Sequence, residues 1–224
     1  MKRRVLVSVA ALCLPWQLRR FLLVYVLGYA IHKTARIGFS LVCPIHLEMG
    51  PHSRIGHLNL CKPGVELLRL EEHATVGNLN WITGESLSST HHFLEDAARR
   101  PELVVHDHAA ITNRHYVDCT ASVSIGRFST FAGLQSVILS HSIDLVACRQ
   151  SAKPVSIGEY CFIGTASVLL GGTALPDYSV LGANSLLNKQ YTERYFLYAG
   201  NPARPLKQLN RDSGYFIRTK GYVD

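Results

Sequence analysis

Aliphatic residues recur at every sixth position over part of the C-terminal half of the chain. The unbroken series is Ile157, Ile163, Leu169, Leu175, Leu181 and Leu187. A period of six is neither the 3.6 of an α-helix nor the alternation of a half-buried strand. It predicts short flat strands, each sending one large side chain inward, with three strands forming a triangular coil of about 18 residues.

Small residues accompany this series. Four positions after the first five aliphatic residues stand Cys161, Ser167, Thr173, Ser179 and Ser185. They would fit beside the inward aliphatic side chains near the corners of the coil. The period continues backwards less regularly, so we expect coils from about residue 35 to about residue 190. The predicted fold is all-β, a left-handed parallel β-helix of hexapeptide repeats.

The pattern divides the chain into three parts. We predict an N-terminal helical segment at 1–34, the β-helix domain at 35–205 and a C-terminal tail at 206–224. Two stretches interrupt the period, and we interpret 87–102 as a short helix or loop and 142–154 as a protruding loop. Insertions in repeat proteins tend to gather on the binding face.

The N-terminal segment is basic and apolar. Residues 5–14 and 21–31 form two apolar runs, and each is shorter than the roughly 20 residues that a transmembrane helix needs. No small-residue cleavage site follows the first run. Three interpretations stay open: the helices cap the domain, residues 1–31 make peripheral contact with a membrane, or the segment is a signal or anchor.

Composition narrows the partners. Lys and Arg outnumber Asp and Glu by 23 to 16, and this net charge of +7 favours an anionic partner such as a phosphate-bearing cofactor. The chain has no long basic run and no nucleic-acid motif, so we do not expect it to bind nucleic acid. Six cysteines without a C-x-x-C pair favour free thiols in the cytoplasm, with the inner face of the membrane open as a location.

His141 is the main candidate for chemistry. It stands directly before the second interruption, four residues after Val137, in the place that small residues occupy elsewhere. A bulky imidazole is hard to bury there, so we expect it to point into a cleft beside the protruding loop. An imidazole with a pKa near 6.5 can act as a base at neutral pH.

Three segments resemble the hexapeptide-repeat acyltransferases. They are SVLGANSLLNK at 179–189, AGNPAR at 199–204, and the stretch from YVDC at 116–119 to SHSID at 140–144. The resemblance covers about residues 105–207 well and 35–85 weakly. The stretch 113–118 and the N-terminal segment are more similar to O-acetyltransferases of colanic acid and polysaccharide biosynthesis than to the small sugar acetyltransferases.

The resemblance implies an acetyl-CoA-dependent O-acetyltransferase that acts on a sugar or polysaccharide precursor. It implies His141 as the general base, a homotrimer, and acetyl-CoA in a groove between subunits. The residues implied to hold the coenzyme are Thr165, Ala183, Asn188, Lys189, Arg204 and Lys207. Asn188 departs from the threonine usual in the family.

Three further residues are candidates for binding the saccharide acceptor. Asn113 and Asp118 lie about one coil before His141, where stacking of coils could bring them near it. His115 is a second candidate histidine, because it stands four residues after Ile111. We assign no metal ligand.

Two other functions stay open on the same fold. One is a zinc enzyme similar to the γ-class carbonic anhydrases, suggested by His106, His108, His115 and His141, because catalytic zinc commonly takes three histidines and a water. The other is a non-catalytic scaffold. The motif GNPAR at 200–204 favours the acyltransferase over the zinc enzyme, and His141 with the loop after it argues against a scaffold.

Overall fold

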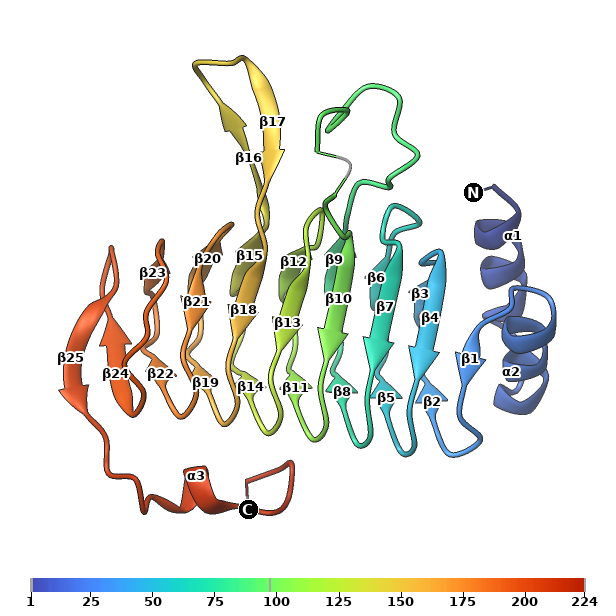
Figure 1. The fold of residues 1–224 in the computed structure, drawn as a ribbon. Coiled ribbons are helices and arrows are strands. Elements are labelled where there is room, and N and C mark those ends of the chain that lie inside the picture. Colours follow the sequence, from blue (N-terminus) through green and yellow to red (C-terminus); the bar gives the residue numbers. More distant parts are fainter. Residues whose placement is uncertain (1, 97, 224) are drawn as a thin grey trace.

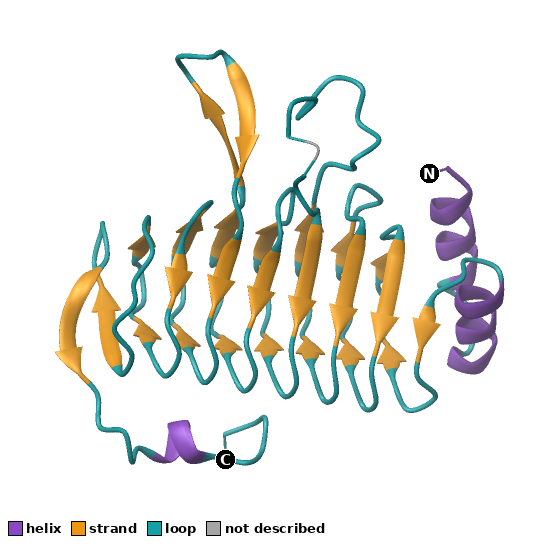
Figure 2. Ribbon diagram, in the orientation of Figure 1, coloured by secondary structure: helices purple, strands orange, loops and turns teal. Residues whose placement is uncertain are grey.

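The computed structural model describes residues 2–96 and 98–223. The chain begins with two helices, α1 (Lys2–Ala11) and α2 (Trp16–Tyr25), winds into a long triangular coil of short strands, and ends in a tail that carries α3 (Gly214–Ile217) (Figures 1 and 2). The coil is a left-handed parallel β-helix, as the six-residue period predicts.

Each turn of the coil places one strand in each of three sheets, which we name sheets A, B and C. Sheet A contains β1 (Ala30–Ile31), β4 (His46–Met49), β7 (Leu67–Leu70), β10 (Glu102–Val105), β13 (Val123–Ile125), β18 (Val155–Ile157) and β21 (Ala174–Leu175). Sheet B contains β2 (Arg36–Ile37), β5 (Arg54–Ile55), β8 (Thr75–Val76), β11 (Ala110–Ile111), β14 (Thr130–Phe131), β19 (Phe162–Ile163), β22 (Val180–Leu181), β24 (Phe196–Ala199) and β25 (Arg204–Gln208). Sheet C contains β3 (Leu41–Val42), β6 (Leu60–Cys61), β9 (Trp81–Thr83), β12 (Tyr116–Asp118), β15 (Val137–Leu139), β20 (Val168–Leu170) and β23 (Leu186–Leu187).

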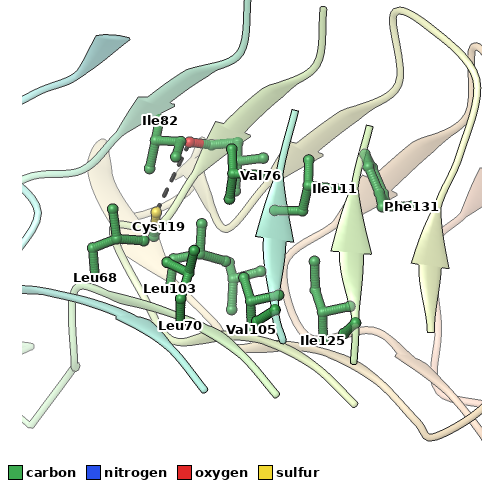
Figure 3. Packing of buried hydrophobic residues seen from close by; sticks show 14 of the residues in the cluster. Leu68, Leu70, Val76, Ile82, Leu103, Val105, Ile111, Cys119, Ile125 and Phe131 are labelled. Carbon is green, nitrogen blue, oxygen red and sulfur yellow. Dashed lines mark hydrogen bonds between the residues drawn. The ribbon is translucent and has the colours of Figure 1, made fainter. Parts of the chain in front are cut away.

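The core is made of columns of inward side chains, one column per sheet. All six aliphatic residues of the 157–187 series are at most 2% exposed, and the five small residues that accompany them are equally buried, which confirms the predicted repeat. Figure 3 shows the middle of the core, where Leu68 and Leu103 of sheet A, Val76 and Ile111 of sheet B, and Ile82 of sheet C converge. Removal of this apolar surface from water is the main force that closes the coil.

Two of the three corners of the coil need a left-handed backbone. From the second turn of the coil onward, residues with a φ of +53° to +61° stand at the corner between sheets A and B and at the corner between sheets B and C. These residues are not glycine, although the left-handed conformation costs L-residues roughly 1–2 kcal/mol each. The third corner, between sheets C and A, differs because the chain leaves the coil there.

At the corner between sheets A and B, the left-handed residues are aromatic and form a continuous stack, which we name the ring column. Its members are His52, His73, His108, Phe128, Tyr160, Tyr178 and Tyr195. Adjacent ring centroids are 4.7–5.3 Å apart and the planes are within 14° of parallel. Stacking of this kind gives back part of the cost of the left-handed backbone.

The C-terminal tail returns along the ring column. The Tyr215 hydroxyl donates to the Cys161 carbonyl at 2.8 Å, and the Arg218 guanidinium lies 3.8 Å from the centroid of the Tyr215 ring. Phe216 is buried edge-on against the rings of the column. The tail therefore covers the C-terminal part of this corner (Figure 1).

Both excursions leave the coil at the corner between sheets C and A (Figure 2). The described part of the first, which joins β9 to β10, is a loop without a helix. The second is not the loop predicted at 142–154 but an antiparallel hairpin of β16 (His141–Asp144) and β17 (Arg149–Ala152), paired from His141–Ala152 to Asp144–Arg149. The hairpin satisfies its own backbone groups, which lets it stand out from the coil.

The helices lie at the N-terminal end of the coil (Figure 1). The buried Arg19 donates to the carbonyls of Gly38 and Ser40 at 2.7 and 2.5 Å, which ties α2 to the first turn. The first strand, Ala30–Ile31, lies within the segment predicted as helical, and β25 crosses the predicted boundary at residue 206. Among the described residues, no helix combines the length and apolar character needed to cross a membrane.

Candidate active site

Asp118 and His141 form a hydrogen-bonded pair at the corner between sheets C and A. Asp118 ends β12 and His141 begins β16, directly after the neighbouring strand β15. His141 Nδ1 lies 2.7 Å from Asp118 Oδ2. The carboxylate is buried, whereas the imidazole is 37% exposed. Since an ionised carboxylate only accepts, Nδ1 carries the proton and Nε2 is left as the acceptor on the open side of the ring.

The surroundings of Asp118 keep it ionised. Thr120 donates to Oδ1 through its hydroxyl at 2.7 Å and its amide at 3.2 Å, while the amide and hydroxyl of Ser140 donate to Oδ2 at 2.9 Å. Burial by itself would raise the pKa of Asp118, but the hydrogen bonds from His141, Thr120 and Ser140 outweigh it and lower that pKa.

The same pair raises the pKa of the His141 imidazole. The hydrogen bond from Nδ1 to Asp118 raises the pKa of His141, partial burial opposes the shift, and the charges of Asp118 and Glu85 add to it. The carboxylate also fixes the tautomer and the orientation of the ring, as the acid of a Ser-His-Asp triad does for its histidine. The arrangement can accept a proton at Nε2 and return it.

The way His141 reaches the corner differs from the prediction. Ile138, not Val137, is the inward residue of β15, because one additional residue lies between Phe131 and Ile138 at the turn through Gly133, whose φ is +71°. His141 therefore does not occupy the small-residue place of the repeat. It is the first residue of the hairpin, and its exposure follows from leaving the coil.

A cleft of about 670 Å³ lies between the two excursions. It is lined by residues 91–96 of the loop and by Ile143 and residues 148–151 of the hairpin. Phe93 connects the cleft to the pair, since its ring meets the His141 ring edge-on with centroids 6.1 Å apart. An ion pair between Glu95 and Arg149 joins the loop to the hairpin across the cleft.

The loop is anchored beside Asp118 by Arg99, which sequence reasoning missed. Arg99 is buried, donates to the carbonyls of Thr120 and Ser86 at 3.1 and 2.8 Å, and places its guanidinium 4.6 Å from the centroid of the Phe93 ring. Burial lowers the pKa of Arg99, and nearby acids oppose the shift. The only signal in the sequence was an arginine inside an excursion, and no period marks its contacts.

His115 lies apart from the pair. It is 2% exposed and sits at the corner between sheets B and C, where Asn59 and Asn80 occupy the same place in the two preceding turns. Its Nδ1 accepts from the Ser136 amide at 3.1 Å, and its Nε2 lies 2.9 Å from the Thr112 hydroxyl. Burial lowers the pKa of His115 to about 4, so the ring is neutral at pH 7.

Asn113 also lies at the corner between sheets B and C. It is half-buried, and its Oδ1 accepts from the Asn78 amide at 2.7 Å. Of the acceptor-binding candidates Asp118 and Asn113, only Asp118 therefore lies beside His141 within a single chain. Asn113 lies at the opposite end of the same strand.

The residues implied to hold a coenzyme divide between two corners and the edge of sheet B. Thr165 and Ala183 are exposed in successive turns at the corner between sheets B and C, with the Asn184 amide donating to the Thr165 carbonyl at 2.9 Å. Arg204 and Lys207 are exposed on β25, at the edge of sheet B. Asn188 and Lys189 are exposed after β23, on the same corner as His141.

The four histidines that suggested zinc are not gathered in one chain. His106 bridges Glu71 and Ser124 at 3.0 Å on each side, and His108 belongs to the ring column. His115 and His141 lie at the other two corners. No cluster of three or more metal-binding side chains occurs in residues 2–96 and 98–223.

Among the solved structures that are similar to this chain, three are described as acyltransferases. A hexapeptide-repeat-containing acetyltransferase from Vibrio cholerae is 17% identical, with a TM-score of 0.50, over 93% of this chain and 90% of that one. A variant of AntD, an N-acyltransferase from Bacillus cereus crystallised with dTDP and coenzyme A, is 13% identical over 82% and 83% of the chains, with a TM-score of 0.48. The polysialic acid O-acetyltransferase OatWY is 18% identical over 80% and 84%, with a TM-score of 0.44. No protein-family model matches the sequence.

Proposed function

We propose that this protein is an acetyl-CoA-dependent O-acetyltransferase that transfers an acetyl group to a hydroxyl of a sugar or polysaccharide precursor. The observation that carries the proposal is the Asp118–His141 pair, a buried carboxylate holding an accessible imidazole at 2.7 Å. The segments at 116–119, 140–144, 179–189 and 199–204, which resemble hexapeptide-repeat acyltransferases, support it. The fold shared with the Vibrio cholerae acetyltransferase agrees with it.

His141 acts as the general base in this proposal. Nε2 removes the proton from the acceptor hydroxyl while the hydroxyl oxygen attacks the thioester carbonyl carbon. The tetrahedral intermediate then collapses, the carbon–sulfur bond breaks, and the coenzyme A thiolate takes the proton back from the imidazolium. Asp118 stays ionised throughout and stabilises the imidazolium. No acyl-enzyme is formed, so the step needs no nucleophilic side chain.

Acetyl-CoA is proposed to bind along the corner between sheets B and C. Thr165 and Ala183 are exposed residues in successive turns, and their backbone is proposed to line the amide-containing arm of the donor. Arg204 and Lys207 supply positive charge near the same end of the coil, which suits its phosphates. Asn188 and Lys189 are proposed to reach the donor from the other side of sheet C.

A homotrimer would complete this site. The outward side chains of sheet C form an apolar column of Leu41, Leu60, Trp81, Tyr116, Val137, Val168 and Leu186. Trp81 is 54% exposed, whereas the outward positions of sheet A include the Glu48–Arg69 ion pair. If three copies turn sheet C toward a common axis, the His141 corner of one copy meets the Thr165 corner of the next. The donor groove would lie between those two corners, and Asn113 of the neighbour would come near His141.

The acceptor is proposed to enter the cleft between the loop and the hairpin. Phe93 lines the cleft and also contacts the His141 ring, and both excursions contribute polar groups to the cleft. Aromatic and polar side chains together suit a saccharide, which offers both apolar ring faces and hydroxyls.

Calorimetric titration with acetyl-CoA and with coenzyme A tests the donor site without knowledge of the acceptor. We expect saturable binding that is weakened by Arg204→Ala with Lys207→Ala and unchanged by His141→Asn. A folded protein that binds neither ligand at millimolar concentration would overturn the proposal, and metal analysis would then test the zinc alternative.

A screen of saccharide acceptors, followed by release of the coenzyme A thiol, tests the reaction. We expect turnover that His141→Asn abolishes while binding of acetyl-CoA persists. Unchanged turnover in that variant would remove His141 as the base, and donor binding without turnover on any saccharide would refute the acceptor class.

A further inference from the structure

The positive charge of the chain is concentrated at its N-terminal end. Residues 1–47 contain seven of the 23 lysines and arginines and no aspartate or glutamate. The remaining residues contain 16 basic and 16 acidic side chains, so the net charge of +7 belongs entirely to the two helices and the first turn of the coil. Such asymmetry marks an electrostatic contact surface rather than general solubility.

The same two helices expose large apolar side chains. On α1 these are Leu6 at 69% and Val9 at 49% exposure. On α2 they are Leu18 at 57%, Phe21 at 56% and Tyr25 at 72%. Their spacing of three or four residues places them on one side of each helix. Apolar residues at this density on the surface of a water-soluble domain indicate a binding face.

The opposite side of each helix is fixed to the β-helix. Arg19 is buried and bonded to Gly38 and Ser40, the Arg20 guanidinium donates to the Ile31 carbonyl at 2.7 Å, and Ser8 on α1 donates to the Val42 carbonyl at 3.4 Å. The exposed apolar side chains are therefore held on a rigid platform. They cannot turn inward to join the core.

Exposed positive charge lies on α1 and in the first turn of the coil, at the same end of the molecule as this apolar surface. Arg3 on α1 and Lys33 and Arg36 in the first turn are exposed. The Arg36 guanidinium donates to the Lys33 and Ala35 carbonyls, which leaves its charge without an acidic partner among the described residues. A second copy of this end would meet its own charge, since like-charged surfaces repel. A nucleic acid would satisfy the charge but not the five exposed apolar side chains.

We infer that helices α1 and α2 bind in the plane of an anionic lipid bilayer. The exposed apolar residues of α1 and α2 enter the boundary between headgroups and acyl chains, and the exposed cations Arg3, Lys33 and Arg36 contact lipid phosphates. A surface that combines an apolar helix face with basic residues and lacks acids fits such an interface. The inference does not depend on the proposed acetyl transfer, and its test needs no substrate.

Sedimentation of the full-length protein with vesicles tests it. The vesicles are equimolar phosphatidylglycerol and phosphatidylcholine, or phosphatidylcholine alone, at low salt and in 0.5 M NaCl. We expect binding to the anionic vesicles that salt weakens, because exposed charges are screened within a few ångströms at that ionic strength. Equal binding to neutral vesicles, or no binding to anionic vesicles at low salt, would overturn the inference.

Matched variants separate the apolar from the electrostatic contribution. The triple variant Leu18→Ser, Phe21→Ser, Tyr25→Ser is expected to weaken binding at least about tenfold, and Arg3→Ser about fivefold. The control replaces two exposed apolar residues of the tail by serine: Ile217, 65% exposed, and Val223, 69% exposed. This control should not change binding to the vesicles. Binding that survives the triple variant, or that the control loses equally, would contradict the proposed surface.

Measuring the oligomeric state tests whether this surface binds a second copy of the chain instead of a membrane. We expect the triple variant to have the same mass in solution and the same melting temperature as the natural chain, because its three side chains are exposed. A change in mass would show that this face joins copies of the chain and would overturn the membrane assignment.

Discussion

Two corners of the same β-helix have opposite characters. The corner between sheets A and B repeats one solution seven times, a left-handed aromatic residue stacked on the next, and the tail covers part of it. The corner between sheets C and A changes from turn to turn, with a loop after β9 and a hairpin after β15. The regular corner carries stacking and burial, and the irregular corner carries the Asp118–His141 pair.

The difference shows how a solenoid can separate stability from chemistry. Stability in such folds is approximately a sum over turns and the contacts between neighbours. One corner can therefore be interrupted while the other two keep the turns in register. His115 and His141 illustrate the contrast, because the repeat absorbs the first into the core and the interruption exposes the second.

The same substitution at these two histidines should give opposite results. We expect His141→Asn to lower kcat by about 10²- to 10⁴-fold, the usual contribution of a general base, with little change in melting temperature. His115→Asn should keep activity and most of the stability, because asparagine occupies this place in the two preceding turns. Steady-state rates and thermal unfolding of both variants provide the measurement. Loss of activity in a folded His115→Asn protein would break the comparison.

Replacing Asp118 by asparagine tests how the carboxylate controls the pKa and the tautomer of His141. The carboxylate raises the pKa of His141. The activity of the natural protein should therefore rise with pH, with a midpoint above 6.5, and reach a plateau at higher pH. In Asp118→Asn the midpoint should move to lower pH and the plateau should fall by about 10²-fold, because the ring loses its fixed tautomer. A pH profile of kcat/KM measures both effects, and an unmoved midpoint would contradict the role of Asp118.

The pair should also leave a mark on stability. A raised His141 pKa in the folded state contributes stability that is complete below the unfolded value near 6.5 and disappears as pH rises through the folded value. In His141→Asn this part of the pH dependence should be lost.

The ring column offers the smallest test. Phe128 is 9% exposed and has a φ of +56°. We expect Phe128→Ala to lower the free energy of unfolding by about 2–4 kcal/mol through loss of packing. Phe128→Gly loses the same ring but removes the left-handed penalty, so it should be more stable than the alanine variant by about 1 kcal/mol. Urea unfolding measures the difference, and acetyl transfer should be unchanged in both.

The sequence was sufficient to predict the coil but not its corners. The inward residues between Ile157 and Leu187 could be found because no insertion disturbs the period there. The ring column could not, since its members His73 and His108 are 35 residues apart whereas Tyr160 and Tyr178 are 18 apart. Excursions at one corner thus conceal a stack at another.

The candidate site was predictable to a similar degree. Asp118 could be predicted to lie near His141, because stacked turns bring residues one turn apart into contact, but it was predicted to bind the acceptor and not to hold the imidazole. Val137 could not be distinguished from Ile138 as the inward residue, because the additional residue near Gly133 leaves the aliphatic pattern intact. Phe93 and Arg99 belong to an excursion without period, and their contacts depend on tertiary packing alone.

The number of turns in the coil also sets the distance between the helices and His141. Sheet C takes four steps from β3, beside the helices, to β15, which delivers His141. Neighbouring strands in a sheet are about 4.8 Å apart, so His141 lies about 19 Å along the axis from the first turn. If α1 and α2 rest on a bilayer as inferred above, this length sets the least distance that a lipid-linked saccharide must extend from the membrane to reach His141. Because the length changes only by whole turns, deleting one turn would shorten that reach by one step and select shorter chains.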